Sequence, residues 1–220
     1  ETAPDHPLAD VAAGLRIAWE TPHVRTLLVT GAVSGLFGGI FAALYLLFAL
    51  KVLGLTPALL GITVAFGGAG ALAGAALAGR LAKALGVGPG ILVSGFGGAL
   101  GAALIPLAPA SPGWGMAVLI ASQLLGDSSA VAGQVLASSL RQSALPTHAL
   151  GRVGGAFQAA AGGAMLLGAL AGGALGAVIG VREALAIAAA GLFAAPLIAL
   201  ASGLGRLKVL PVSDGSESTG

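Results

Sequence analysis

Long apolar runs alternate with short gaps that contain proline, glycine or polar residues along most of the chain. A helix needs about 20 apolar residues to cross a hydrocarbon core of ~30 Å, and six runs reach that length. The gaps hold turn-forming residues, such as those at 56–57 and 109–112. The pattern therefore predicts an all-α polytopic membrane bundle over residues 26–204. Its six transmembrane helices are expected at 26–50, 58–79, 90–108, 113–139, 153–179 and 184–204.

Two polar flanks enclose this bundle. Residues 1–25 are mildly amphipathic and are expected to form a cytoplasmic lead-in or a linker between two halves of a longer protein. Residues 205–220 end in VSDGSESTG, whose composition is typical of a disordered cytoplasmic tail. The chain opens ETAPDHPLAD, without Met or an apolar signal core, so we interpret it as a piece of a longer chain.

Composition strengthens the membrane assignment and excludes several functions. The chain is 57% hydrophobic and 8% charged, whereas a soluble domain carries about 25% charged residues. There is no cysteine, which removes disulfides and thiolate metal sites, and we expect no cofactor and no metal. The net charge of +2 is too small to indicate a nucleic-acid partner.

The basic residues predict the orientation in the membrane. With both termini on one side, eight of the ten Lys and Arg residues fall on that side, and Lys51 and Arg182 fall opposite. The positive-inside rule then places both termini in the cytoplasm. The eight are Arg16, Arg25, Arg80, Lys83, Arg141, Arg152, Arg206 and Lys208.

Polar side chains concentrate on the first and fourth predicted helices. At 100° per residue, the polar residues of the fourth helix fall within about 60°, and a stripe on the first helix spans about 80°. The third and sixth helices have almost no polar interior, so we expect them to face lipid. This period of three predicts a 3+3 inverted repeat. The stripes are Gln123, Asp127, Gln134, Ser138 and Arg141, and Thr30, Ser34, Phe37, Phe41 and Tyr45.

Asp127 is the one acid inside a predicted span, too deep for its short side chain to reach the headgroups. A central Asp costs roughly 2.5 to 3.5 kcal/mol on insertion scales, and no Lys or Arg lies at matching depth. Two interpretations stay open. Neighbouring helices or Ser128 satisfy it by hydrogen bonds and it fixes packing, or it faces a cavity whose changing hydration loads and releases a proton, because desolvation favours the neutral acid.

Small residues mark the second and fifth helices. Gly70 and Gly74 have GxxxG spacing, and the fifth helix continues it through Gly168, Gly172, Gly176 and Gly180. Such spacing lets helix backbones approach closely. The first pair is equally explained by the abundance of glycine. For the four glycines of the fifth helix we expect close packing against a neighbouring helix. We expect the second helix to lie beside the same contact, on the side that faces the N-terminal half of the longer protein.

Together these features resemble the C-terminal half of a major facilitator superfamily transporter. GRLAKALG retains Gly79, Leu81, Ala82 and Gly86 of that superfamily's loop signature, but has Lys83 and Ala84 where the signature has Asp and Arg. A second loop resembles that of the branch with enterobactin-type siderophore and macrolide exporters. It matches at Arg141, Gln142, Pro146, Gly151, Arg152 and Val153.

The second loop also has a purely structural explanation. Arg141 suits the negative end of the fourth helix, Pro146 stops helical continuation, and Gly151 permits a tight start to the fifth helix. The loop is therefore either a well-terminated hairpin or part of gating between two halves.

Residue types argue against catalysis. An intramembrane serine protease needs a membrane histidine as base, and an aspartyl protease needs two membrane carboxylates. A channel needs a ring of charged side chains or a filter of carbonyl groups, and the sequence shows no motif for either. A structural or partner-binding membrane protein is the alternative to a transporter. The candidate nucleophiles are Ser128 and Ser129, and the histidines outside the spans are His6, His23 and His148.

The sequence thus predicts half of a secondary active transporter, not an enzyme, in the bacterial cytoplasmic membrane. The resemblance implies efflux of small amphipathic molecules by alternating access, with protons as coupling ion in an antiporter. The expected partners are an N-terminal six-helix half, the lipid bilayer and the small-molecule substrate. The expected substrate and proton pathway comprises Asp127, Gln123, Gln134, Gln158, Tyr45, Phe41, Phe37 and Ser34.

Overall fold

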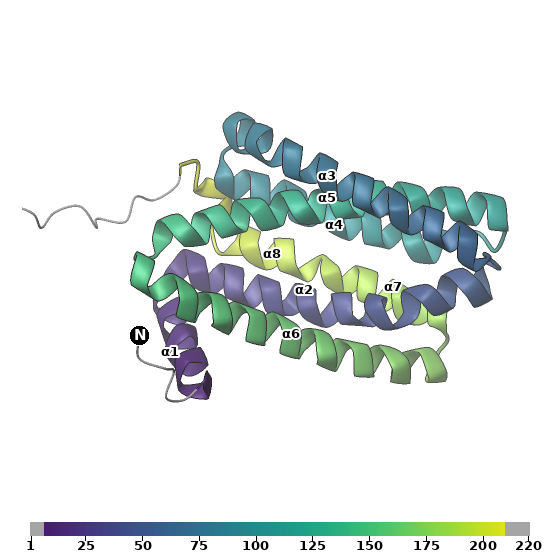
Figure 1. The fold of residues 1–220 in the computed structure, drawn as a ribbon, viewed down its shortest axis with the longest axis horizontal. Helices are drawn as coiled ribbons and strands as arrows, with labels where there is room; N and C mark the ends of the chain where they lie inside the picture. Colours follow the sequence, from purple (N-terminus) through teal and green to yellow (C-terminus); the bar gives the residue numbers. More distant parts are fainter. Residues whose placement is uncertain (1–6, 210–220) are drawn as a thin grey trace, which may run out of the picture.

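The computed structural model describes residues 7–209, and in that range every regular element is helical (Figure 1). The start of the expected lead-in, residues 1–6, and most of the expected tail, residues 210–220, lie outside the described residues. The long helices after α1 (Pro7–Glu20) are α2 (Pro22–Leu47), α3 (Pro57–Leu85), α4 (Val87–Leu107), α5 (Pro112–Ala144), α6 (Thr147–Val178) and the pair α7 (Val181–Leu192) and α8 (Ala194–Ala201).

Six of these helical segments are long and apolar enough to cross a membrane, which confirms the all-α class and the number of spans. The short π-helix η1 (Phe48–Val52) continues α2, and α7 with α8 forms the sixth span. Several helices run past the apolar runs; α6 begins at Thr147, six residues before the predicted start at 153. Helix formation needs backbone hydrogen bonds rather than apolar side chains, so polar residues extend the helix beyond the apolar run.

Proline and glycine fix the helix ends. Pro22, Pro57 and Pro112 each stand at the start of a helix, where a missing N–H costs nothing and the fixed φ suits the first turn. Gly86 and Gly180 join consecutive spans with φ of +92° and +100°, values that residues with a Cβ rarely adopt. The connections α3–α4 and α6–α7 are therefore tight turns.

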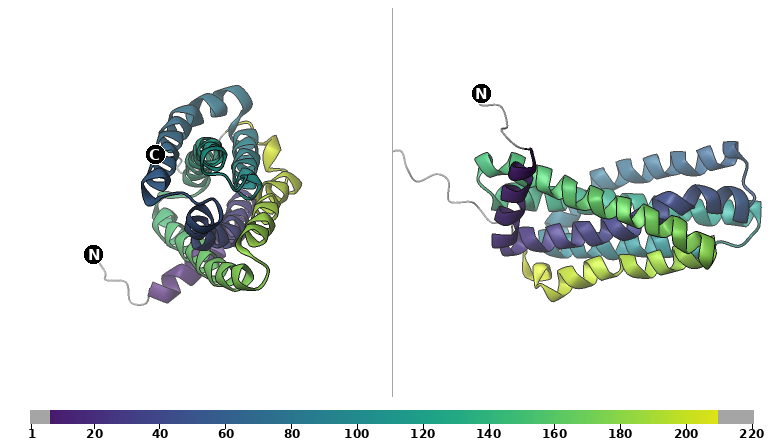
Figure 2. Two further views of the ribbon diagram at one scale, coloured as in Figure 1. Left: turned by 90° about the vertical axis from the view of Figure 1, so that its right-hand side faces the viewer. Right: turned by 90° about the horizontal axis from the view of Figure 1, so that it is seen from below.

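The spans form two groups that run side by side (Figures 1 and 2). The end-on view shows α3, α4 and α5 in one group and α2, α6 and α7–α8 in the other, with α1 lying across one end against α6. Within the groups, α3 and α4 pack along α5, and α6 packs along α2. Both ends of the described chain lie at the same end of the bundle, as an even number of spans requires.

Glycines make these helix pairs close. A Cβ at Gly74 would overlap the Ser128 carbonyl on α5, and one at Gly168 would overlap the Leu36 carbonyl on α2. The close packing expected for the fifth helix is therefore present, but the expectation that the second helix lies beside the same contact is wrong. The glycines of α6 pack on α2 and those of α3 pack on α5, because each series faces a different polar-striped helix. Gly180 belongs to a turn rather than to the series.

The third and sixth spans are tied together at both ends. At one end the Arg182 guanidinium donates to the carbonyls of Pro106 at 2.5 Å and Ala108 at 2.8 Å, and it lies over the Phe48 ring. At the other end the Gly88 N–H donates to the Leu207 carbonyl at 2.8 Å. These bonds satisfy groups that helix ends leave unpaired, and they hold α4 against α7–α8 at both ends. Between them Phe96 of α4 lies near Phe193, with ring centroids 6.4 Å apart.

Candidate functional site

An open cavity of about 910 Å³ lies between the two groups of helices. That volume is near the upper end of the usual range for small-molecule sites, about 300 to 1,000 Å³. Its walls come from α2, α6 and the α7–α8 pair on one side and from α4 and α5 on the other, with Val64 contributed by α3. Most of the lining is alanine, glycine and aliphatic residues, with a small number of polar groups set among them.

Most of the residues predicted for the pathway meet at this cavity. One does not: Phe37 is absent from the lining, and its ring lies against Gly191 of α7 and packs on a core cluster around Leu44 and Phe48. The predicted pathway residues that line the cavity are Ser34, Phe41 and Tyr45 from α2, Gln123, Asp127 and Gln134 from α5, and Gln158 from α6.

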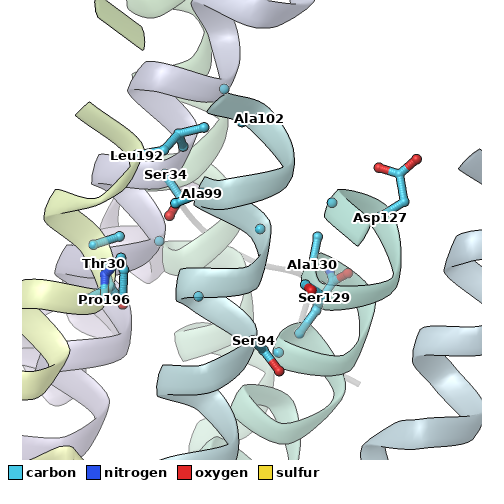
Figure 3. Close-up of a pocket in the computed structure, with 18 of the residues that line it drawn as sticks. Thr30, Ser34, Ser94, Ala99, Ala102, Asp127, Ser129, Ala130, Leu192 and Pro196 are labelled. Atoms are coloured by element: carbon cyan, nitrogen blue, oxygen red, sulfur yellow. The ribbon is translucent and has the colours of Figure 1, made fainter. Parts of the chain in front are cut away.

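The third and sixth spans also line the cavity, so the expectation that they simply face lipid is wrong. They have the largest buried share of the six spans. Small residues on α4 form its lining face, and Pro196 and Ala199 do the same on α8. Figure 3 shows Ser94 on the side of α4 toward α5 and Ala99 on the side toward Ser34, and both line the cavity. The spacing of these small residues at three and four positions was the signal in the sequence.

Asp127 lies on the wall of the cavity at the side nearest α3. Its carboxylate points toward Gly67, where a Cβ would overlap Oδ2 and lie 3.0 Å from Nε2 of Gln123. Figure 3 shows the carboxylate extending away from Ser129 and Ala130. The missing side chain at Gly67 thus provides the space that the Asp127 and Gln123 side chains occupy. Nothing in the sequence spacing of α5 indicated this contact.

No partner within residues 7–209 neutralises Asp127. Neither ion pair of the described chain involves it, and none of the described side chains donates it a hydrogen bond. The Ser128 hydroxyl, one candidate for satisfying it, donates to the Leu125 carbonyl at 3.1 Å. In the part of the chain that the structure describes, no three acidic or histidine side chains gather to hold a metal ion.

Tyr45 brings a second polar group to the same region. Its hydroxyl is buried and has no hydrogen-bond partner among the described residues. Thr63 on α3 is a neighbouring hydroxyl; it donates to the Leu60 carbonyl at 2.7 Å, and its oxygen can still accept from Tyr45. A buried unpaired hydroxyl costs about 1 to 3 kcal/mol, so the Tyr45 hydroxyl needs an acceptor, which Thr63, water or a ligand group can supply.

At the end of α5 the cavity carries its positive group. Arg141 lies 4.7 Å above the centre of the Phe157 ring from α6, and both residues line the cavity. Ser138 and Gln134, at earlier positions on α5, and Gln158, beside Phe157 on α6, line the same region. The cavity therefore has an acid near its middle and a base toward one end.

The loop-motif residues lie around this end of the bundle. Arg152 pairs with Asp10 of α1 at 3.1 Å, and Pro146 is the N-cap of α6. The expected role of Gly151 is wrong: α6 already begins at Thr147, so Gly151 lies inside the helix and a Cβ there would meet open space. Gly86 occupies the α3–α4 turn described above, Gly79 is open and Gln142 is exposed.

Comparison with protein families settles the class. A family model described as "Transmembrane secretion effector" matches residues 3–214. The chain belongs to this family of major facilitator superfamily transporters. The match confirms the superfamily resemblance seen in the sequence, and it indicates a multi-pass membrane transporter. A search of curated proteins finds no match for the chain.

Proposed function

We propose that the chain is the C-terminal half of a proton-coupled exporter that moves small amphipathic molecules by alternating access. The observation that carries this proposal is the unpaired Asp127 carboxylate on the wall of a large and mainly apolar cavity. An apolar wall with a few polar groups suits an amphipathic substrate. A single acid at membrane depth suits a proton site.

In this mechanism the carboxylate changes protonation as its surroundings change. When the cavity is open to water, Asp127 is solvated and releases its proton; when the walls close, desolvation favours the neutral acid. Gln123 and Tyr45 lie near it and offer groups that hydrogen-bond either form. The proton gradient then drives the rocking that carries substrate outward.

The arrangement of helices supports the proposed inverted repeat. If the first three spans exchange with the last three, the pair α2–α6 becomes α5–α3, and these are two extensive helix contacts of the bundle. Arg182 at the start of the sixth span and Gly88 at the start of the third each contact the end of the other span. Such symmetry favours a site where the repeats meet, and helices of both proposed repeats, α2 and α4 from the first and α5, α6 and α7–α8 from the second, line the cavity.

The remaining parts of the proposal are its partner and location. An N-terminal six-helix half would complete the pathway by covering the open side of the cavity. The exposed apolar residues of α3 and α6, such as Leu72 and Leu170, suit contact with lipid or with that half. The basic residues support cytoplasmic termini in a bacterial cytoplasmic membrane, and the 141–153 loop supports the siderophore and macrolide exporter branch.

The test is Asp127→Asn in the full-length protein, assayed in inverted membrane vesicles with a fluorescent amphipathic dye. We expect proton-driven dye transport to fall to background, with normal abundance in the membrane, because Asn cannot carry a proton. Substitution of the neighbouring Ser128, whose hydroxyl bonds its own helix, to Ala is the matched control and should transport normally. Normal, pH-dependent transport by Asp127→Asn would refute the proton role.

A further inference from the structure

Arg141 is the one positively charged side chain in the cavity lining formed by the described residues. It belongs to the last turns of α5, and its guanidinium is only partly exposed. A cation at the end of a helix is favourable by about 0.3 to 1 kcal/mol. An arginine on the outer face of the same helix end would gain the same stabilisation from the helix dipole. The dipole therefore does not explain why the Arg141 side chain faces the cavity.

Three other arginines of the described chain have oxygen partners, whereas Arg25, Arg80 and Arg206, like Arg141, have none among the described residues; of these four, Arg141 is the one that lines the cavity. Arg16 bonds Glu20, Arg152 bonds Asp10, and Arg182 bonds two backbone carbonyls. Across residues 7–209, Arg141 has a ring beneath it but donates no hydrogen bond to a carboxylate or carbonyl oxygen. A guanidinium has five N–H donors in a planar fork, so the fork is available to a ligand from the cavity side.

Asp127 does not supply the missing anion. The two residues are separated by 14 positions on α5, which is about 21 Å along the helix axis. Across that distance their attraction is about 0.8 kcal/mol at an effective dielectric constant of about 20. The two groups are therefore too far apart to form an ion pair, and the Arg141 fork is left without an anion.

We propose that Arg141 binds the anionic head of an amphipathic molecule at this end of the cavity. Carboxylate, phosphate and sulfonate groups accept the two parallel N–H bonds of the fork. Phe157 forms the floor beneath the guanidinium, while Ser138 and Gln158 offer further donors beside it. The apolar body then lies along Leu27, Ile91 and the alanines of the wall.

This inference rests on the proposed export function and names the class of its substrate: amphiphiles with an acidic head. The head group of an anionic lipid has the same chemistry. We commit to a soluble amphiphile as the occupant, because the apolar lining continues from Arg141 through the interior of the bundle to Leu46 and Ile105.

The experiment measures binding rather than transport, so it does not depend on Asp127. The purified full-length protein in phosphatidylcholine nanodiscs is titrated with a dansyl-labelled medium-chain carboxylic acid and, separately, with its neutral amide. Arg141→Gln should weaken carboxylate binding by about 10- to 100-fold, the equivalent of a charge-assisted hydrogen bond, and leave the amide unchanged. Arg141→Lys, which keeps the charge but loses the fork, should restore only part of the affinity.

The control is Arg80→Gln, which removes an exposed charge from α3 outside the cavity and should not change binding. Asp127→Asn should bind the carboxylate at least as well as the unmodified protein, even if its transport is lost. Equal weakening by Arg80→Gln and Arg141→Gln would indicate bulk electrostatics and overturn the proposal. Absence of carboxylate binding in phosphatidylcholine nanodiscs would also overturn it. Carboxylate binding that is present in phosphatidylcholine and abolished by added phosphatidylglycerol would show that an anionic lipid occupies the site, which would overturn the choice of a soluble occupant.

Discussion

Gly67 on α3 should control the position of the Asp127 carboxylate, and Gly67→Ala tests this. The added Cβ would overlap Oδ2 of Asp127 and lie 3.0 Å from Nε2 of Gln123. Both atoms are the far ends of flexible side chains, so the clash is relieved by rotation rather than by separating α3 from α5. The substitution therefore moves the carboxylate while leaving the helix pair in place.

The two effects on stability nearly cancel. Forcing a side chain away from its rotamer costs about 0.5 to 1.5 kcal/mol, and replacing a helical glycine by alanine returns about 1 kcal/mol. The same 0.5 to 1.5 kcal/mol now disfavours the original position of the Asp127 carboxylate. The fraction of molecules with the carboxylate in that position therefore falls roughly 2- to 13-fold. We expect proton-driven transport to fall by a similar factor, with thermal unfolding within a few degrees of the unmodified protein.

Gly68→Ala is the matched control, because a Cβ at the adjacent residue meets nothing within 4 Å. Transport in inverted vesicles is measured across a range of external pH, together with thermal unfolding in detergent. The reasoning fails if Gly67→Ala transports with the rate and pH profile of Gly68→Ala. It also fails if Gly67→Ala unfolds as readily as Gly74→Ala, where the new Cβ overlaps the backbone carbonyl of Ser128 and the helices must separate.

Two further predictions concern α6 and α2. Gly172→Leu should lower thermal stability by several degrees, because its Cβ would lie 2.9 Å from the Ile40 Cα, whereas Gly173→Leu points into open space and should be tolerated; equal stability of both variants would contradict the packing. In the cysteine-free chain, Phe41→Cys should react with a water-soluble maleimide and be protected by substrate, because Phe41 lines the cavity. Phe37→Cys, beside Gly191, should react slowly. Similar reaction rates at both positions would contradict the placement of Phe41 on the cavity wall and Phe37 away from it.

The sequence predicted the six spans well because apolar length is a direct consequence of bilayer thickness. The sequence also grouped polar residues onto one face of α2 and one face of α5, and Ser34, Gln123 and Asp127 of these faces line the cavity. The boundaries were less certain. Thr147 starts α6 well before the apolar run, because backbone hydrogen bonding continues through polar residues.

The remaining errors concern contacts between helices. Phe37 shares a face with Phe41 on the first helix, yet it lies against Gly191 rather than on the cavity wall, because α2 packs against α7 there. Gly67 gave no signal of its own, since the side chains that occupy its space come from α5. A pattern within one helix fixes its faces but not the neighbour that each face meets.

The same distinction explains how α5 can carry two charges in an apolar protein. Asp127 and Arg141 are about 40° apart around the helix axis, so both face the cavity, yet about 21 Å of helix separates them. A pair close enough to bond would neutralise both groups and leave neither free for a proton or an anion. Separated along one face, the acid stays in the middle of the span, where hydration changes most during alternating access. The base stays near the helix end, where burial of a cation costs least. Under the two proposals above, α5 is the helix on which proton coupling and substrate recognition meet. Gly67 of α3 leaves room for the Asp127 carboxylate, and Phe157 of α6 lies beneath the Arg141 guanidinium.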